Sequence, residues 1–303
     1  MSAWKDAKER LRIWATKLKL FAAYELRGKR SPRFVFVHLP KTAGTSTTFY
    51  ICRRVGWTKT GNSMNFSEMP WRRPHPAGLL DRANKVRYLY GHLSFATVDK
   101  LDTGLRPNFM FHFQRDPRAR VASHYRHMHT GLTRFVDKNG NPRKDVPTYD
   151  LFVKCAPLSA EDFFGADDDE LGYLVDNLSV RQMAGDMVTY PISDEQWPML
   201  MERAKENLKR LDFVGFQETY NEDFAELIRR MRLKSGRDTS AAYNRNVHKG
   251  DREPLRFPEG SKAAANLERY IKYDQALYDF AKQLYDQGYW SERKGLSARP
   301  ARR

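Results

Sequence analysis

The stretch FVFVHLPKTAGTSTTFYICRRV, residues 34–55, decides the fold of this chain. Its first four residues, Phe34 to Val37, are β-formers without a polar residue between them, which is typical of a strand buried on both faces of a parallel sheet. Pro40 ends the strand, and the apolar pattern resumes in helical fashion from Phe49 to Val55. Strand, tight polar loop and helix together predict an anion-binding site, because backbone N–H groups at a helix N-terminus point toward the ligand.

The predicted loop is small and rich in hydroxyl groups. Its residues are Lys41, Thr42, Ala43, Gly44, Thr45, Ser46 and Thr47. A Walker A loop places its lysine directly after the last glycine, whereas Lys41 precedes Gly44 by three residues, so the loop does not indicate an ordinary NTPase. We expect its backbone N–H groups and Lys41 to hold a phosphate.

A second strand-loop-helix unit is FMFHFQRDPRARVASHYRHM, residues 109–128. Asp116 is a suitable N-cap, and Pro117 suits the first helical position because its missing N–H costs nothing there. Arg115 at the strand end and Ser123 about two helical turns later can meet at one anion. Alone, the RDP sequence is equally well explained as a helix cap with a salt bridge; two such units in one chain favour two anion sites.

These two motifs resemble the carbohydrate sulfotransferases, the branch that includes heparan sulfate 2-O-sulfotransferase, and their bacterial relatives. HLPKTAGTS is similar to the loop that binds the 5′-phosphosulfate of 3′-phosphoadenosine 5′-phosphosulfate (PAPS), and Arg115 and Ser123 match the motif for its 3′-phosphate. The resemblance spans roughly residues 32–288. It rests further on YLYGHLSF (88–95), DNLSVRQMAG (176–185), FVGFQETYNEDFAEL (213–227) and YDQALYDFAKQLYD (273–286).

His92 is the predicted general base. YLYGH reads as a strand that ends in a glycine turn, which puts the imidazole at the carboxyl edge of the sheet, beside the cofactor. A histidine after glycine is catalytic in the matching motif of the family, although a lone histidine is more often structural. We expect His38 to brace the loop and His112 to be packed in its strand. His124 lies in a helical region with two further histidines, a pattern common on solvated faces.

Two further segments are candidates for cofactor contacts. Arg181 and Gln182, in the 176–185 segment, match a polar helix near the family's site, although an ordinary helix surface explains them as well. The loop YNRNVHKGDREPLRF, residues 243–257, corresponds to a segment that closes over the adenosine, with Asn246 and Lys249 as candidates. Its match to the family is loose, because hydroxyl residues found in some relatives are missing.

Composition indicates a soluble enzyme. The chain has 303 residues and a net charge of +16, with only two cysteines, so a disulfide framework is not indicated and a reducing compartment fits. Nucleic acid is an obvious partner for a basic chain, but no zinc-finger, RNA-binding or helix-turn-helix pattern is present. An anionic cofactor, an acidic glycan or glycolipid acceptor, or a membrane surface explains the charge as well. No metal-ligand cluster is evident, and sulfuryl transfer does not require a metal.

The N-terminus predicts a basic amphipathic helix, residues 1–30. Apolar residues repeat at spacings of three and four from Trp4 to Phe21, with basic residues between them. The helix can pack on its own domain, form a homodimer, or contact an anionic membrane. The chain shows no secretory signal and no apolar stretch long enough to cross a bilayer, so a cytoplasmic location is expected, with peripheral contact at the inner face of the membrane as an option.

The predicted fold is α/β: a P-loop-like, three-layer domain at residues 31–288, with a central mostly parallel sheet flanked by helices and a basic, disordered tail at 289–303. Strands are expected near 34–38, 86–90, 109–114 and 212–216. Helices are expected at 3–26, 46–55, 118–129, 171–184, 195–210, 218–233 and 261–287.

The predicted function is transfer of a sulfuryl group from PAPS to an acceptor hydroxyl, with a carbohydrate or glycolipid as the acceptor. Lys41 is expected to stabilise the leaving phosphate and His92 to take the proton. Two other functions fit the same motifs. One is a P-loop kinase-like phosphotransferase; the other is a non-catalytic, membrane-associated module that binds the product nucleotide PAP.

Overall fold

A computed structural model describes residues 15, 33–62, 86–101, 108–132, 149–185, 189–233 and 254–292. Within these ranges, five parallel strands form one sheet in the order β2-β3-β1-β4-β5. The strands are β1 (Arg33–Val37), β2 (Thr60–Asn62), β3 (Tyr88–Gly91), β4 (Asn108–Gln114) and β5 (Phe213–Phe216). Because neighbouring strands run in the same direction, the residues that follow β3, β1 and β4 meet at one edge of the sheet.

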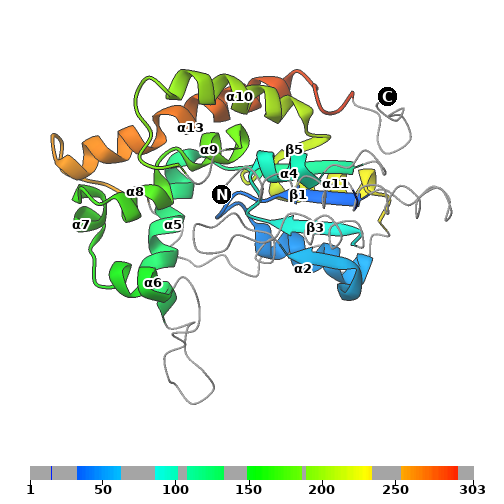
Figure 1. Cartoon of the computed structure of the whole chain (residues 1–303), viewed down its shortest axis with the longest axis horizontal. Helices are drawn as coiled ribbons and strands as arrows, with labels where there is room; N and C mark the ends of the chain where they lie inside the picture. Colours follow the sequence, from blue (N-terminus) through cyan, green and yellow to red (C-terminus); the bar gives the residue numbers. More distant parts are fainter. Residues whose placement is uncertain are drawn as a thin grey trace, which may run out of the picture.

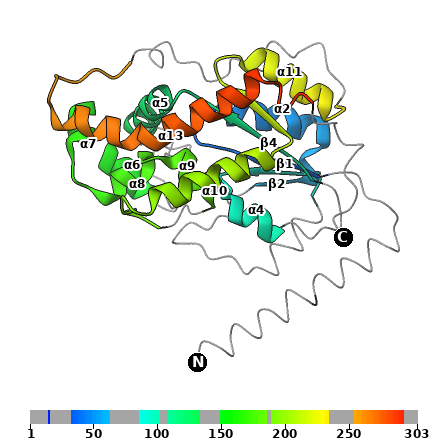
Figure 2. The same cartoon turned by 90° about the horizontal axis from the view of Figure 1, so that it is seen from above.

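Helices cover both faces of the sheet (Figure 1, Figure 2). One face carries α2 (Gly44–Val55) and α11 (Tyr220–Arg230). The other carries α4 (Phe95–Leu101), α9 (Leu178–Ala184), α10 (Trp197–Arg210) and the long α13 (Lys262–Asp286). The predicted three-layer α/β fold is therefore confirmed, and the described sheet is parallel throughout.

The central strand β1 is buried on both faces, which explains why Phe34 to Val37 include no polar residue. Phe34 and Phe36 pack into the core under α2 and α11, whereas Val35 and Val37 pack into the opposite core with α9 and α10. All four side chains are buried. A strand with two buried faces reads as a continuous apolar run, because side chains alternate between the faces.

A third group of helices extends beyond the carboxyl edge of the sheet. It comprises α5 (Pro117–Gly131), α6 (Tyr149–Cys155), α7 (Ala160–Gly165) and α8 (Asp169–Val175), which share a separate apolar core with the first half of α13. In Figure 1 these helices lie beside the sheet rather than over it. They form one wall next to the loops that follow the strands.

The prediction of a single helix over 171–184 is wrong. The structure has α8 and α9 instead, separated at Asp176 and Asn177, and Asn177 is left-handed with φ 43°. The Asn177 side-chain oxygen accepts from the backbone N–H groups of Tyr273 and Asp274 at 2.7 and 2.9 Å. These tertiary hydrogen bonds to α13 break a helix that the local pattern favours.

The other predicted elements within the described ranges are confirmed, with ends shifted by up to three residues. Strands expected near 34–38, 86–90, 109–114 and 212–216 are β1, β3, β4 and β5, and α2, α5, α10, α11 and α13 occur where helices are expected. The short elements β2, η1 (Trp57–Lys59), α4, α6 and α7 were not predicted. The expected helix at 3–26 and residues 293–303 of the expected disordered tail lie outside the described residues. The tail was expected to begin at 289, but Trp290 is buried and packs in the core with α10, so that boundary is wrong. None of the helices described could cross a membrane.

Candidate active site

The loop between β1 and α2 has an unusual backbone. Lys41 and Ala43 both have positive φ angles, 71° and 59°, in a short turn that the Thr42 hydroxyl closes by donating to the Leu39 carbonyl at 2.8 Å. No side chain caps the N-terminus of α2, and its first turn holds no acidic residue. The first N–H groups of a helix have no intrahelical acceptor, and the helix dipole favours negative charge there. The loop is therefore suited to an anion.

Gly44 is required at the start of α2 because of His38. A Cβ atom on Gly44 would lie 1.8 Å from the Nε2 atom of His38, so no other residue fits without moving that ring. The His38 ring is in turn stacked between Phe36 and His92, with centroid distances of 5.0 and 4.6 Å. The prediction that His38 braces the loop agrees with this packing.

His92 follows β3 and lies next to the loop. Its Nδ1 atom is 3.0 Å from the His38 carbonyl oxygen. A carbonyl can only accept, so Nδ1 carries the proton and Nε2 keeps its lone pair. Burial lowers the pKa of His92 below the usual 6.5, and Lys41 lowers it further, although the bond to the His38 carbonyl opposes both. At neutral pH the ring is an uncharged acceptor, as a general base must be.

Arg115 connects the two predicted anion sites. The residue follows β4, and its Nη1 atom donates to the Lys41 carbonyl at 3.0 Å. The structure thus brings Arg115 to the loop that starts α2. Asp116 caps α5 by accepting from the Ala119 N–H at 2.8 Å, and Pro117 occupies the first turn, as predicted. Ser123, about two turns into α5, is buried with 3% of its surface exposed.

Arg181 and Gln182 face inward instead of toward open solvent, and both are fully buried. Arg181 donates to the Tyr173 carbonyl at 2.8 Å, and its guanidinium lies over the rings of Tyr173 and Tyr190. The structure does not bring Arg181 to the Lys41 loop. The contact of Arg181 with a nucleotide stays a prediction. Its bond to the Tyr173 carbonyl and its packing on two tyrosine rings do not favour that contact.

His124 differs from the expectation of a solvated helix face. Its side chain is buried, and its Nδ1 atom has no hydrogen-bond partner among the described residues. Burial lowers its pKa well below 6.5, and the neighbouring charges that act in the same direction include Arg120 and Lys41. Sequence reasoning missed this burial because the histidines of this region looked periodic and exposed. His112 is packed in β4, as expected.

Several candidates lie elsewhere. Asn246 and Lys249 fall outside the described residues, so their predicted contacts remain predictions. Trp57 is 53% exposed and follows the C-terminal end of α2. Since α2 has 12 residues and a helix rises about 1.5 Å per residue, Trp57 lies roughly 18 Å from the anion loop.

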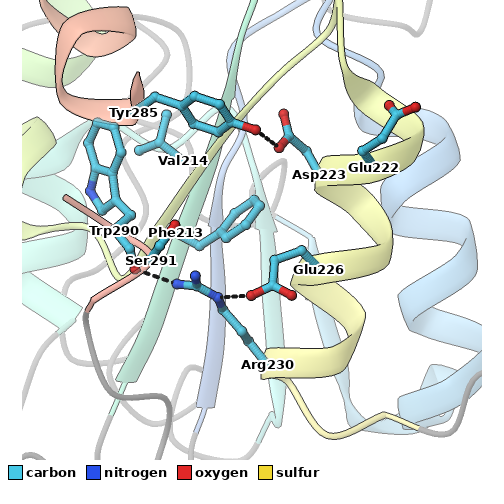
Figure 3. Close-up of a pocket in the computed structure, with 9 residues that line it drawn as sticks. All are labelled: Phe213, Val214, Glu222, Asp223, Glu226, Arg230, Tyr285, Trp290 and Ser291. Carbon is cyan, nitrogen blue, oxygen red and sulfur yellow. Dashed lines mark hydrogen bonds and ion pairs between the residues drawn. The ribbon is translucent and has the colours of Figure 1, made fainter. Parts of the chain in front are cut away.

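A cavity of about 230 Å³ beside β5 is separate from this cluster. Figure 3 shows its lining from β5, α11 and the end of α13, including Phe213, Arg230 and Tyr285. Arg230 is already occupied, because it pairs with Glu226 and donates to the Trp290 carbonyl. Lys41, His92 and Arg115 do not line this cavity, so the candidate site is the loop edge and not this space.

Comparison with known proteins identifies the family of the chain. The model of the sulfotransferase family matches residues 25–289, which include both strand-loop-helix units and His92. No curated protein matches the chain. The family match covers most of the chain, and the chain therefore belongs to the sulfotransferase family.

Proposed function

We propose that the protein transfers a sulfuryl group from PAPS to an acceptor hydroxyl, with His92 as the base. The family match supports sulfuryl transfer in general. The observation that carries the finer proposal is the neutral His92 imidazole, with its proton on Nδ1, stacked 4.6 Å from His38 at the edge of the anion loop. When bound, PAPS supplies the activated sulfuryl group and leaves as the product nucleotide PAP, which is 3′,5′-ADP.

The residues at the loop edge fit the two anionic ends of such a donor. The uncapped start of α2, residues Thr42 to Ser46, would hold the 5′-phosphosulfate through backbone N–H groups. The expectation that Thr47 also binds is corrected here, because its N–H already donates to the Ala43 carbonyl at 3.1 Å. Arg115 and Ser123 would hold the 3′-phosphate, the guanidinium through charge-assisted hydrogen bonds and the serine through its hydroxyl. Arg115 already contacts the Lys41 carbonyl, so one side chain would serve both the loop and the phosphate.

Lys41 and His92 would divide the chemistry between them. The His92 Nε2 atom would take the proton of the attacking hydroxyl, since Nδ1 is held by the His38 carbonyl. The Lys41 ammonium would stabilise the negative charge that develops on the leaving phosphate. The electrostatic effect of Lys41 on the pKa of His92 is consistent with the two groups lying close together.

The proposed acceptor is a hydroxyl group of a carbohydrate or a glycolipid. A carbohydrate or glycolipid acceptor rests on the resemblance of HLPKTAGTS to carbohydrate sulfotransferases. The described residues hold 25 basic and 25 acidic side chains, so the whole +16 excess lies outside them, including residues 1–30 and the tail. We therefore propose that those segments give a cytoplasmic enzyme peripheral contact with an anionic membrane. The alternative role of residues 1–30, the predicted amphipathic helix, is homodimerisation.

The test is to incubate the full chain with labelled PAPS and extracts of host lipids, glycans and metabolites, and to identify the labelled product. Lys41→Ala and His92→Ala should each lower turnover by about 100-fold or more. Near-wild-type turnover in His92→Ala would remove His92 from the role of base.

Binding measurements separate the rival functions. Calorimetry that shows PAP binding, without transfer to any acceptor, would favour the non-catalytic binding module. Tight, magnesium-dependent binding of ATP but not of PAP would favour the kinase-like phosphotransferase.

A further inference from the structure

One buried amide joins the ends of the two strands that lead into the candidate site. Gln182 lies in α9 with no exposed surface, and its Nε2 atom donates to the carbonyl of His38 at 3.0 Å and to the carbonyl of Leu93 at 2.9 Å. His38 follows β1 and Leu93 follows β3. Since an amide nitrogen has two N–H groups, both are used on these two backbone carbonyls.

The His38 carbonyl is also the group that orients His92. It accepts from Nδ1 of His92 at 3.0 Å and from Gln182 at 3.0 Å. A carbonyl oxygen has two lone pairs, so these two donors use its full accepting capacity. The bond to this oxygen places the proton of His92 on Nδ1, and Gln182 donates to the same oxygen.

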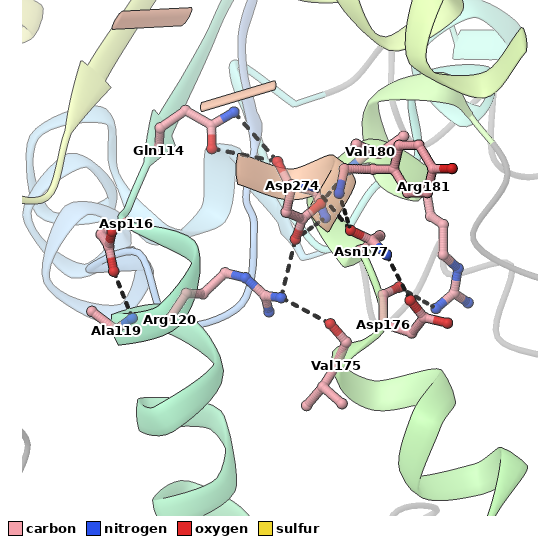
Figure 4. Close-up of polar contacts among 12 residues, drawn as sticks. Gln114, Asp116, Ala119, Arg120, Val175, Asp176, Asn177, Val180, Arg181 and Asp274 are labelled. Atoms are coloured by element: carbon pink, nitrogen blue, oxygen red, sulfur yellow. Dashed lines mark hydrogen bonds and ion pairs between the residues drawn. The ribbon is translucent and has the colours of Figure 1, made fainter. Parts of the chain in front are cut away.

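The N-terminal end of α9, the helix that carries Gln182, is held by a buried aspartate of α13. Asp274 accepts from the N–H groups of Ser179 and Val180, at 3.2 and 2.9 Å, and pairs with Arg120 at 3.2 Å (Figure 4). The Arg120 and Asp274 side chains are almost completely buried. Breaking such a buried pair is costly, so the start of α9 has little freedom to move. Arg120 belongs to α5, the helix that also carries Ser123.

We infer that Gln182 is a positioning residue for His92, acting through the His38 carbonyl and the end of β3. The inference rests on the proposed function, in which His92 is the base. In this role Gln182 acts through other groups and not on the acceptor or the donor. A backbone bond from the His38 N–H to the Gly91 carbonyl, at 3.0 Å, already joins the ends of β1 and β3. The two bonds of Gln182 add to it by holding the carbonyl oxygens of His38 and Leu93.

Three other titratable side chains interact with His92 by stacking or through their electrostatics. They are His38 on the end of β1, Lys41 in the loop and His124 on α5. Burial keeps the pKa values of His38 and His124 below 6.5, so Lys41 is the cation among these groups at neutral pH. Replacing Gln182 leaves all three in place, so a change at His92 would report on the hydrogen bond and not on a lost charge.

The test compares Gln182→Met with Asn207→Leu. Methionine has nearly the shape of glutamine but cannot donate, so both bonds are lost at little change in volume. Asn207 is the matched control: it is another buried amide, on α10, whose Nδ2 donates to the Met183 carbonyl of α9 at 2.8 Å. Its loss disturbs α9 without changing the His38 carbonyl.

Two measurements are made on each variant. Nitrogen-15 NMR of labelled histidine gives the tautomer of His92, and steady-state kinetics gives kcat and the KM for PAPS. In Gln182→Met we expect the Nε2–H tautomer to appear and kcat to fall by about 10-fold, because a misplacement of 1 Å costs up to about 100-fold. The KM for PAPS should stay within about twofold. Asn207→Leu should keep the Nδ1–H tautomer and the wild-type kcat.

The inference is overturned if Gln182→Met keeps the wild-type tautomer or the wild-type kcat, or if Asn207→Leu produces the same changes. Should Gln182→Met fail to fold, Gln182→Asn replaces it: the side chain is one methylene shorter, cannot reach both carbonyls, and should produce the same changes to a smaller degree. The NMR measurement needs no turnover. Failure of sulfuryl transfer in the wild type would therefore count against the proposed function, while the tautomer would still test the role of Gln182.

Discussion

The two strand-loop-helix units look alike in the sequence but begin their helices in opposite ways. After β4, α5 starts with a side-chain cap, in which Asp116 accepts from the Ala119 N–H, and with Pro117, which has no N–H to satisfy. After β1, α2 starts with Ala43 in a left-handed conformation and with no side-chain cap. One helix start has a side-chain cap, and the other has none.

The difference indicates how each unit would bind its anion. At α2, backbone N–H groups and the helix dipole are available, so the loop needs small residues and no acid. At α5, Asp116 accepts from the Ala119 N–H and Pro117 has no N–H, so fewer backbone donors remain. An anion there would be held by side chains, namely Arg115 and Ser123. Backbone donors suit a group that many nucleotides share, whereas an arginine gives selectivity for the additional 3′-phosphate.

The largest expected effect concerns His112. This residue of β4 donates from Nδ1 to the Val37 carbonyl of β1, and so links the two units. Burial lowers its pKa from 6.5 to about 4. In the unfolded chain His112 binds a proton below pH 6.5, whereas in the folded chain it does so only below about pH 4. The free energy of unfolding therefore falls as the pH falls between these values. His112 alone accounts for a loss of about 3 kcal/mol over this range.

Urea unfolding at pH 7.5 and pH 4 measures this loss of free energy of unfolding. In His112→Gln the loss should be smaller by about 3 kcal/mol, because the amide can donate to the Val37 carbonyl and does not titrate. An equal loss in wild type and variant would show that His112 is not the group responsible.

The second effect concerns Gly44→Ala in the uncapped unit. The added Cβ atom would overlap the His38 ring, so the loop must open and its N–H groups must turn from the anion. Since hydrogen bonds to charged groups contribute about 1.5–3 kcal/mol, loss of one or two should weaken PAP binding by about 100-fold. Calorimetry with PAP measures it. Gly165→Ala in α7, where a Cβ atom meets nothing within 4 Å, is the control and should bind PAP normally.

The third effect concerns Arg115→Ala in the capped unit. Loss of a charge-assisted contact should weaken PAP binding by about 30-fold, while binding of AMP, which lacks the 3′-phosphate, should change much less. Selectivity for PAP over AMP would then nearly disappear. Equal losses for the two nucleotides would mean that Arg115 acts only through its bond to the Lys41 carbonyl.

The smallest effect concerns the cap itself. Asp116→Ala should lower the free energy of unfolding by about 1 kcal/mol, whereas Asp116→Asn, which keeps a capping oxygen, should change it by only a few tenths. Denaturant unfolding gives both values. If the two variants lost the same amount of stability, the charge of Asp116 and not its capping bond would be the stabilising feature.

Local patterns predicted a large part of the fold and of the site. The apolar run at Phe34 to Val37 determines a strand buried on both faces, and RDP determines a capped helix start, because both depend only on neighbouring residues. Lys41, Arg115 and His92 each follow a strand of one parallel sheet, so their convergence at one edge could be predicted as well. The structure brings these three residues together.

Inward-facing polar side chains were not predictable in the same way. Gln182 and Arg181 are adjacent in one polar segment, yet Gln182 reaches the His38 carbonyl while Arg181 packs on Tyr173 and Tyr190. His124 is buried although its spacing looks like that of a solvated face. The phase of a short helix decides which side chain faces the core, and that phase depends on contacts far away in the sequence.

The sequence by itself determined the parallel sheet, the two strand-loop-helix units and membership of the sulfotransferase family. Strand burial, loop residues and helix caps act over a few neighbouring residues, so they can be recognised without the rest of the chain. Only the tertiary structure decided where the helix at 176–177 breaks and which nitrogen of His92 carries the proton. Both depend on hydrogen bonds between distant segments, from Asn177 to α13 and from His92 to the His38 carbonyl, which exist only once the chain has folded.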